Sequence, residues 1–397
     1  MLAYRITHKR DDRLKALIEA VGVEPAALGT LCTKASLLNI MLKNVKTSWA
    51  NIIKQEMLAC GGDAAISRHS YACKEQFTDV ILMGTKSQLT RFVQKMNVQP
   101  DCFNIVATSV ERILANKQAV IRVAGKTYDL SKDFMVIGVL NVTPDSFSDG
   151  GKYFSYDAAL KRAEELIKFG ADVIDVGGES TRPDSSIVSE EQEMERVIPI
   201  IEAVSKQLGA VVSVDSYKSR VVKEALKAGA RLINDISSGS VVEPCVKEIT
   251  SYNASVIAMM NNSTNELRGC TPVVDTELPE ERFVDFCNSQ RQALLGFGIS
   301  EERMIFDPGV GFGLSVNDTS RILSSIESLT TLGYAICAGI SRKSYVGKVT
   351  GLNIDARDNV CNAISLYLMD RGVKIFRTHD PEGLGSVIKA YRALEGA

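Results

Sequence analysis

From about residue 134 onward, short apolar runs alternate with amphipathic helical patterns along the chain. Each run is almost continuously apolar, as expected of a parallel strand that is covered on both faces. Several helical patterns, among them 158–170, 219–229 and 282–298, end with a glycine, the usual C-terminal stop. The eight predicted strands are 134–141, 171–178, 210–216, 230–237, 254–261, 303–309, 334–341 and 373–380.

Eight strands that are each followed by a helix predict an α/β fold, and specifically a closed (β/α)8 TIM barrel. Residues 134–397 also have nearly the length, roughly 250 residues, that is typical of such a barrel. An open, doubly wound sheet is the alternative, and the number of strands favours the barrel. The segment 119–131 resembles a hairpin around Gly125, which could close the floor of the barrel before its first strand.

Residues 1–117 follow a different pattern and predict a small α/β domain ahead of a barrel domain at 118–397. We expect a charged helix at its N-terminus and further elements at 36–42 (strand), 48–59 (helix), 64–68 and 78–84 (strands) and 87–96 (helix). This domain carries no recognisable chemical motif. A structural cap, a dimerisation element and a partner-binding module all remain open as its role.

Composition narrows the class of protein. Lysine and arginine number 46 against 48 aspartate and glutamate, and this near-neutral balance gives no global field for nucleic acid or a membrane surface. No apolar run reaches the roughly 20 residues of a membrane helix, and the charged N-terminus lacks the apolar core of a signal peptide. Nine scattered cysteines without a CxxC pair are typical of reduced thiols, so a cytoplasmic protein is expected.

Polar residues gather where the apolar runs end, which is where a TIM barrel builds its active site. A single one of them is explained as well by a helix cap or a turn. Because buried polar groups cost several kcal/mol unless they are paired or used, polar residues at nearly every strand end indicate a functional site. They are Asn141, Asp175, Asp215, Asn234, Asp307, Lys343, Arg377 and His379.

The loops after the strands suggest what the site binds. The Thr181-Arg182 pair offers a hydroxyl and guanidinium donors suited to phosphate. Three glycines in 307–313 allow the backbone to approach a ligand closely, and Phe312 could present an aromatic face there. Arg377 and His379 share strand parity and would face one cavity, which favours an anionic ligand. These residues predict a site for a polar ring with phosphates at its edge.

Seven motifs now identify a resemblance. In chain order they are GVLNVTPDSFSDGG (138–151), DVGGESTRP (175–183), SVDSYK (213–218), INDIS (233–237), DPGVGFG (307–313), GISRKS (339–344) and RTHD (377–380). With these motifs, residues 119–397 resemble the dihydropteroate synthase family. The resemblance implies the condensation of 6-hydroxymethyl-7,8-dihydropterin diphosphate with p-aminobenzoate, in which magnesium assists the release of diphosphate. It also implies a homodimer formed through helices away from the barrel mouth.

The resemblance further assigns roles to residues. The pterin would be bound by Asp215, Asn234, Met259, Asp307 and Lys343, of which Asp215, Asp307 and Lys343 form the catalytic set. The diphosphate would be held by Asn141, Arg182, Arg377 and His379, with Asn141 near the magnesium ion. The p-aminobenzoate side would comprise Thr181, Arg182, Pro183, Phe312 and Ser344. Loop residues that would order over the substrates are Thr143, Asp145 and Phe147, together with Thr181.

Three positions depart from the family pattern. Met260 stands where a histidine is usual, Leu314 where a lysine is frequent, and Asp184 where a glycine is usual. None removes a residue assigned to the chemistry, and we expect them to affect affinity before activity. A pterin-dependent methyltransferase would not need the STRP loop, the SRKS lysine or the Arg/His pair. A non-catalytic pterin-binding scaffold is the other alternative, and the presence of Asn141, Arg377 and His379 counts against it.

Overall fold

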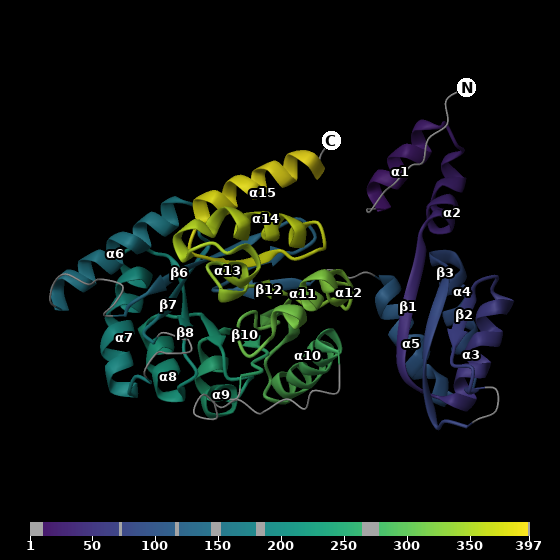
Figure 1. Cartoon of the computed structure of the whole chain (residues 1–397), viewed down its shortest axis with the longest axis horizontal. Helices are drawn as coiled ribbons and strands as arrows, with labels where there is room; N and C mark the ends of the chain where they lie inside the picture. The colour runs from purple at the N-terminus through teal and green to yellow at the C-terminus, as the bar shows by residue number, and fades with distance from the viewer. Residues whose placement is uncertain are drawn as a thin grey trace. The chain divides into compact units, whose positions relative to one another are not determined.

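The computed structural model describes residues 11–70, 74–115, 119–143, 152–179, 187–263 and 278–395. By its internal contacts the chain divides into two compact units, Met1–Lys117 and Gln118–Ala397 (Figure 1). The two units are described separately below.

The N-terminal unit packs helices on one face of a three-stranded antiparallel sheet with the strand order β1–β3–β2. Alternate residues of β3, such as Val80 and Leu82, are buried against Ile53, Met57 and Phe92 of the helices. Its elements are α1 (Asp11–Ala20), α2 (Pro25–Ala35), β1 (Leu37–Lys46), α3 (Thr47–Ala59), β2 (Asp63–Ile66), β3 (Phe77–Thr85), α4 (Lys86–Met96), the 3-10 turn Asp101–Phe103 and α5 (Asn104–Ala115).

The second unit is an eight-stranded parallel sheet that closes on itself, which confirms the barrel over the open sheet. Its strand order is β11–β10–β9–β8–β7–β6–β13–β12. The first and last strands of this order meet where Phe306 pairs in parallel with Ile336, and the Phe306 N–H donates to the Ala335 carbonyl at 2.8 Å. The strands are β6 (Met135–Asn141), β7 (Val173–Gly177), β8 (Val211–Asp215), β9 (Leu232–Asp235), β10 (Ser255–Met259), β11 (Met304–Asp307), β12 (Cys337–Ala338) and β13 (Ile375–Thr378).

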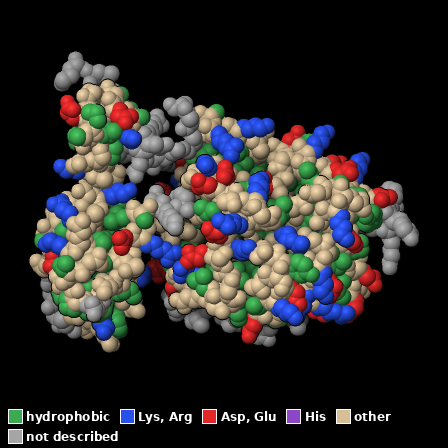
Figure 2. Space-filling model, turned by 180° about the vertical axis from the view of Figure 1, so that it is seen from behind, with side chains coloured by type: hydrophobic (Ala, Val, Ile, Leu, Met, Phe, Trp, Pro, Cys, Tyr) green, Lys and Arg blue, Asp and Glu red, His purple; other side chains and the backbone are tan. Residues whose placement is uncertain are grey.

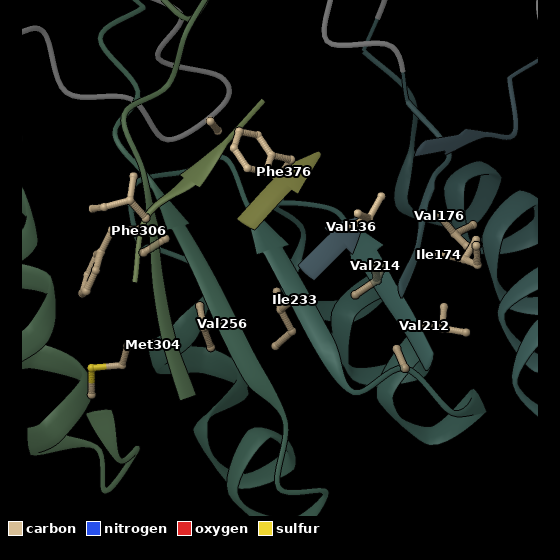
Figure 3. Close-up of a cluster of buried hydrophobic side chains, with 14 of the residues drawn as sticks. Val136, Ile174, Val176, Val212, Val214, Ile233, Val256, Met304, Phe306 and Phe376 are labelled. Carbon is tan, nitrogen blue, oxygen red and sulfur yellow. The ribbon is translucent and has the colours of Figure 1, made fainter. Parts of the chain in front are cut away.

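Helices surround this barrel and cover its outer face. Outward side chains of successive strands, among them Val136, Val176, Val214, Val256 and Phe306, form the core between the sheet and the helices (Figure 3). The helices are α6 (Lys152–Lys168), α7 (Glu190–Lys206), α8 (Ser219–Ala228), α9 (Val242–Ser251), α10 (Pro279–Gly296), α11 (Val316–Ser324), α12 (Ile326–Thr330), α13 (Ser344–Thr350), α14 (Asp358–Met369) and α15 (Pro381–Glu395), with 3-10 turns at Glu301–Arg303 and Ile354–Ala356.

A hairpin closes the floor of the barrel, as the sequence predicts. It consists of β4 (Val120–Val123) and β5 (Lys126–Asp129). Ile121 and Tyr128 of this hairpin pack with the inward side chains Ile137 and Ile305 in one buried cluster. Because the barrel interior is filled by side chains at this end, an open site can form only at the other end, where the strands finish.

The surface agrees with the balanced composition. Basic and acidic side chains are interspersed over the larger unit on the face that Figure 2 shows. Within the described ranges, no helix combines the length and the apolar character that crossing a membrane requires.

Candidate active site at the barrel mouth

A pocket lies at the carboxyl ends of β8 to β13, as expected for this fold. Much of its lining comes from strand ends: Asp215, Met259 and Asp307 are the last residues of their strands. The lining comprises Asp215, Asn234, Ile236, Met259, Asp307, Val310, Phe312, Gly339, Lys343 and Arg377. Seven of these ten were candidates from the sequence, so side chains from six parts of the chain are brought together as expected.

The centre of the pocket is an ion cluster built around Arg377. Its Nε donates to Asp175 Oδ2 at 2.6 Å, and its Nη2 donates to Asp215 Oδ2 at 2.6 Å. Asn234 Nδ2 donates to the same Asp175 oxygen at 3.2 Å. Asp175 is fully buried and receives no role from the resemblance. An aspartate in the middle of the apolar strand β7 was the feature that could have identified it as the partner of Arg377.

Two carboxyl groups in the pocket are less acidic than usual. Burial raises the pKa of Asp215 to about 7; the Arg377 charge opposes this rise, and the Asp175 charge adds to it. Burial also raises the pKa of Asp307, against the hydrogen bond that Gly309 N–H donates to its Oδ1 at 2.7 Å. Near neutral pH, Asp215 can therefore take up or lose a proton with little change in conditions.

Lys343 brings an ammonium group to the opposite wall. Its Nζ lies 4.2 Å from the centre of the Phe312 ring, a cation–π distance. Burial lowers the pKa of Lys343 to about 8; the Arg377 charge lowers it further, while Asp307 and Asp215 oppose the change. The pocket thus combines carboxylates, an amide, two cations and an aromatic ring. That set suits a flat polar ring with both donors and acceptors.

The glycines of 307–313 make room for the chain's own backbone. Gly309 has φ of +72°, and a Cβ there would lie 1.8 Å from the Met260 carbonyl oxygen. Gly313 has φ of +74°, and its Cβ would lie 2.1 Å from the Asn262 carbonyl carbon. The Met260 N–H donates to the Asp307 carbonyl at 2.9 Å. At these two positions the glycine backbone closely approaches residues 260–263 of the same chain rather than open ligand space.

The remaining described candidates lie outside the lining. His379 is half-buried, its Nδ1 lies 3.0 Å from Ser341 Oγ, and burial together with the Arg377 charge lowers its pKa to about 3. His379 is therefore neutral at pH 7 and is not a second cation beside Arg377. Asn141, at the end of β6, and Ser344, at the start of α13, are exposed, while Thr143 is half-buried.

Part of the predicted site cannot be compared with the structure. Asp145 and Phe147 of the first loop, and the second-loop residues Thr181, Arg182 and Pro183, lie outside the described residues, as does Asp184.

A closed barrel with a polar, mixed-charge pocket at its mouth is typical of a TIM-barrel enzyme that acts on a small polar molecule. The family model described as "Pterin binding enzyme" matches residues 137–379, more than half of the chain. The dihydropteroate synthase of Bacillus subtilis is 38% identical over 261 residues, which cover 66% of this chain and 88% of the relative.

Solved structures give the same result. A dihydropteroate synthase from Clostridium difficile, determined in the presence of pteroic acid, is 35% identical with a TM-score of 0.62, covering 67% of this chain and 98% of its own. The enzyme from Xanthomonas albilineans with 4-aminobenzoic acid is 32% identical with a TM-score of 0.63, covering 70% and 99%. The chain therefore belongs to the pterin-binding enzymes and, among them, to the dihydropteroate synthase family, transferases of folate biosynthesis.

Proposed function

We propose that the pocket catalyses the condensation of 6-hydroxymethyl-7,8-dihydropterin diphosphate with p-aminobenzoate, giving 7,8-dihydropteroate and diphosphate. The observation that carries the proposal is the convergence of Asp215, Asn234, Asp307, Lys343 and Arg377 on one pocket. Relatives solved in the presence of pteroic acid and with 4-aminobenzoic acid support the same substrates.

The pterin ring is held by hydrogen bonds at its edge and by packing on its face. Asp215, Asn234 and Asp307 offer acceptor oxygens to the ring N–H and amino groups, and the Lys343 ammonium donates to ring acceptors. Met259, which is buried in the lining, packs against the ring face. The carboxylate, amide and Met259 groups lie at strand ends and Lys343 lies on the turn before α13, so the ring is oriented before reaction.

The reaction breaks the bond between the pterin methylene and the diphosphate oxygen, and the aromatic amine then attacks the methylene. Positive charge develops on the methylene and spreads into the ring as the diphosphate takes the electron pair. The ionised Asp215 carboxylate opposes that charge from a fixed position. The amino group of p-aminobenzoate is neutral near pH 7, and the proton that its nitrogen loses after attack can pass to the departing diphosphate or to water. The residues therefore contribute mainly positioning and electrostatics rather than a strong base.

Arg377 and His379 serve the diphosphate in different ways. Arg377 uses Nε and Nη2 on aspartates, and its Nη1 makes no hydrogen bond to a described residue, so it is available to an anion. His379 is neutral and contributes a hydrogen bond rather than charge. Asn141 completes the described part of this subsite, and Arg182 belongs to it by the family resemblance.

Magnesium fits this subsite as a companion of the substrate. Mg²⁺ usually keeps several waters and takes one or two protein oxygens together with substrate phosphates. Among the described residues no group of three or more metal-ligating side chains occurs, whereas Asn141 offers one exposed amide oxygen at the mouth. When bound with the diphosphate, the ion neutralises charge that builds on the leaving group.

The p-aminobenzoate side is assigned to Phe312 and Ser344 together with Thr181, Arg182 and Pro183. By the family resemblance, the first loop with Thr143, Asp145 and Phe147 would order over the bound substrates and exclude water. We also propose a homodimer through helices away from the mouth, on the family resemblance alone. Light scattering of the full chain tests it, and a monomer mass at micromolar concentration would contradict it.

Diphosphate release tests the reaction. Purified protein receives the dihydropterin diphosphate and Mg²⁺, with and without p-aminobenzoate, and we expect release that depends on p-aminobenzoate. Lys343→Ala should abolish this release. Lys348→Ala, which removes an exposed lysine of the neighbouring helix α13, should leave it unchanged. Pterin binding without turnover would instead support a paralogue that keeps the pocket for another role, with Met260 and Asp184 as the marks of the change.

A further inference from the structure

The turn that carries Lys343 into the pocket has an unusual backbone. Arg342, directly before Lys343, has φ of +58°, the left-handed region that non-glycine residues rarely adopt. The Lys343 N–H donates to the Ile340 carbonyl at 3.2 Å, which closes the turn, and Lys343 stands just before α13. A conformation of this kind costs of order 1–3 kcal/mol and persists only when neighbouring groups hold it.

Two residues at the start of α14 hold this turn. The Asp358 carboxylate accepts from Arg342 Nε at 3.1 Å and from Nη2 at 2.9 Å, a two-pronged ion pair. Arg357 Nη1 donates to the carbonyl oxygens of Arg342 at 3.1 Å and Lys343 at 3.2 Å. Its Nε donates to the Leu352 carbonyl at 3.0 Å. A single guanidinium therefore satisfies two successive carbonyls of the turn and ties them to Leu352, two residues past the end of α13.

Gly347 of α13 leaves space for this guanidinium. A Cβ built on Gly347 would lie 2.2 Å from Arg357 Nη2 and 2.6 Å from its central carbon. Any side chain at 347 would therefore displace the Arg357 head group. Alanine is otherwise favourable in a helix interior, by roughly 0.5–1 kcal/mol over glycine. Position 347 thus offers a way to move Arg357 without weakening the helix.

We infer that Arg357 is a positioning residue for Lys343: it fixes the backbone of the 340–343 turn so that the ammonium enters the pocket. Arg357 is not part of the pocket lining, so it acts through Lys343 rather than on substrate. Asp358 supports the same turn through Arg342. The inference rests on the proposed function, because it assumes that Lys343 binds the pterin.

Loss of this support moves Lys343 away from the groups that face it. They are Asp215 of β8, Asp307 of β11, Arg377 of β13 and the Phe312 ring. A misplacement of about 1 Å in a reacting site can cost on the order of 100-fold in rate. It also exposes the ammonium, so the pKa of Lys343 should return from about 8 toward the ordinary value near 10.4.

Two variants test the inference in different ways. Arg357→Met removes the guanidinium, and Gly347→Ala pushes it aside while favouring the helix. We expect both to lower turnover by about 10- to 100-fold. The fall of turnover at alkaline pH, expected near pH 8 in the wild type, should move to higher pH in both variants. Arg231→Met is the matched control, because Arg231 Nη1 also donates to two carbonyls, of Leu226 and Ala230, before β9 at the other end of the barrel. It should lower stability and leave the pH profile unchanged.

The outcomes separate the inference from the proposed function. If the wild type turns over and both variants keep its rate and pH profile, Arg357 does not position Lys343. If the wild type does not release diphosphate, the proposed function fails. The positioning inference is then tested by acetylation of Lys343 at pH 7 to 10, followed by mass spectrometry. A lower pH midpoint of labelling for the wild type than for Arg357→Met supports it, whatever the absolute rates, and identical midpoints contradict it.

Discussion

Arg377→Met isolates the charge at the centre of the pocket. The substitution keeps most of the apolar stem and removes the guanidinium that bonds Asp175 and Asp215 at 2.6 Å each. Asp175 has no exposed side-chain surface and Asp215 has 13%, so neither carboxylate can turn to water without moving the barrel mouth. The variant therefore leaves two buried carboxylates without their shared cation.

The size of the effect depends on pH, and its sign follows from linkage. Removing one partner of a buried ion pair costs about 3–5 kcal/mol of stability. The folded-state pKa of Asp215 is raised to about 7, above its value near 3.9 in the unfolded chain. Between these values the folded protein binds the extra proton, so stability falls as pH rises. Without the opposing Arg377 charge the pKa rises further, and each added unit costs about 1.4 kcal/mol once pH exceeds it.

We therefore expect Arg377→Met to lose more stability at pH 8 than at pH 5, by about 1–2 kcal/mol. Urea unfolding at both pH values, followed by far-ultraviolet circular dichroism, measures the difference. Trp49 is the single tryptophan and lies in the N-terminal unit, so its fluorescence follows that unit and not the barrel. Equal losses at the two pH values would refute the argument.

A matched arginine separates loss of charge from loss of a hydrogen bond. Arg196 Nη1 donates to the Gly178 carbonyl at 2.8 Å, so Arg196→Met leaves a carbonyl and no carboxylate unpaired. Its cost should be about 1 kcal/mol and the same at pH 5 and pH 8. Adding Asp175→Asn to Arg377→Met should recover part of the stability, because one of the two stranded charges is gone.

Three further predictions concern other parts of the barrel unit. Asp215→Asn should lower kcat far more than pterin affinity measured by calorimetry, because the amide keeps the shape and loses the charge that opposes the cationic methylene; equal losses in both would contradict this role. Lys218→Met should cost about 3–5 kcal/mol in thermal unfolding, because Lys218 Nζ bonds the buried Glu179 and Glu193 carboxylates at 2.5 Å. Glu193→Gln in the same chain should restore part of that loss, whereas purely additive losses would refute the pairing. Gly309→Ala should unfold or aggregate the protein, because the new Cβ would meet the Met260 carbonyl. Gly298→Ala is the control: Gly298 has φ of +80° and no atom within 4 Å of the new Cβ, so the variant should cost about 1 kcal/mol of backbone strain. Similar thermal unfolding midpoints for the two variants would show that the contact with Met260 does not matter.

Periodicity predicted the barrel because each strand is buried on both faces. All eight apolar runs contain a strand, even β12, where only Cys337 and Ala338 have regular pairing. Apolar runs mark parallel strands because helices cover one face and the barrel interior the other. The point of closure could not be predicted, because the Phe306–Ile336 pairing depends on the curvature of the whole sheet and not on any local pattern.

The N-terminal unit was predicted less completely. The three strands and the helices α1, α3 and α4 were expected, whereas α2 and α5 were not. α2 has no buried residue and contains Gly29, so it shows no amphipathic stripe. α5 begins Asn-Ile-Val-Ala-Thr-Ser-Val, residues that mostly have modest helix propensity. The helical state of α5 is set by its packing, since Val106, Ala107 and Val110 are buried, and single-residue preferences do not describe that packing.

The site shows which information a sequence carries and which it does not. Strand parity predicted that Arg377 and His379 face one cavity; Arg377 lines the pocket, whereas His379 lies outside the lining. Parity does not reveal partners, so the bond from Arg377 to Asp175, 202 residues earlier in the chain, was missed. The sequence paired His379 with Arg377 as groups for an anionic ligand but could not give its charge state; burial beside Arg377 keeps it neutral. Charge states in a buried pocket depend on distances between strands, and those appear only once the barrel has closed.

The same distances imply that the two halves of the proposed substrate help each other to bind. Before substrate arrives, Arg377 Nη2 holds the same Asp215 carboxylate that is assigned to the pterin. An anionic diphosphate near Nη1 competes with Asp215 for the guanidinium, and a pterin ring competes with Arg377 for the carboxylate. Each half of the substrate therefore weakens the contact that hinders the other half. The binding free energy of the joined substrate should therefore be more favourable than the sum of the binding free energies of pterin alone and diphosphate alone. Calorimetry of the three ligands measures this difference directly. Independent, additive binding of the two halves would show that the Arg377–Asp215 bond survives in the complex.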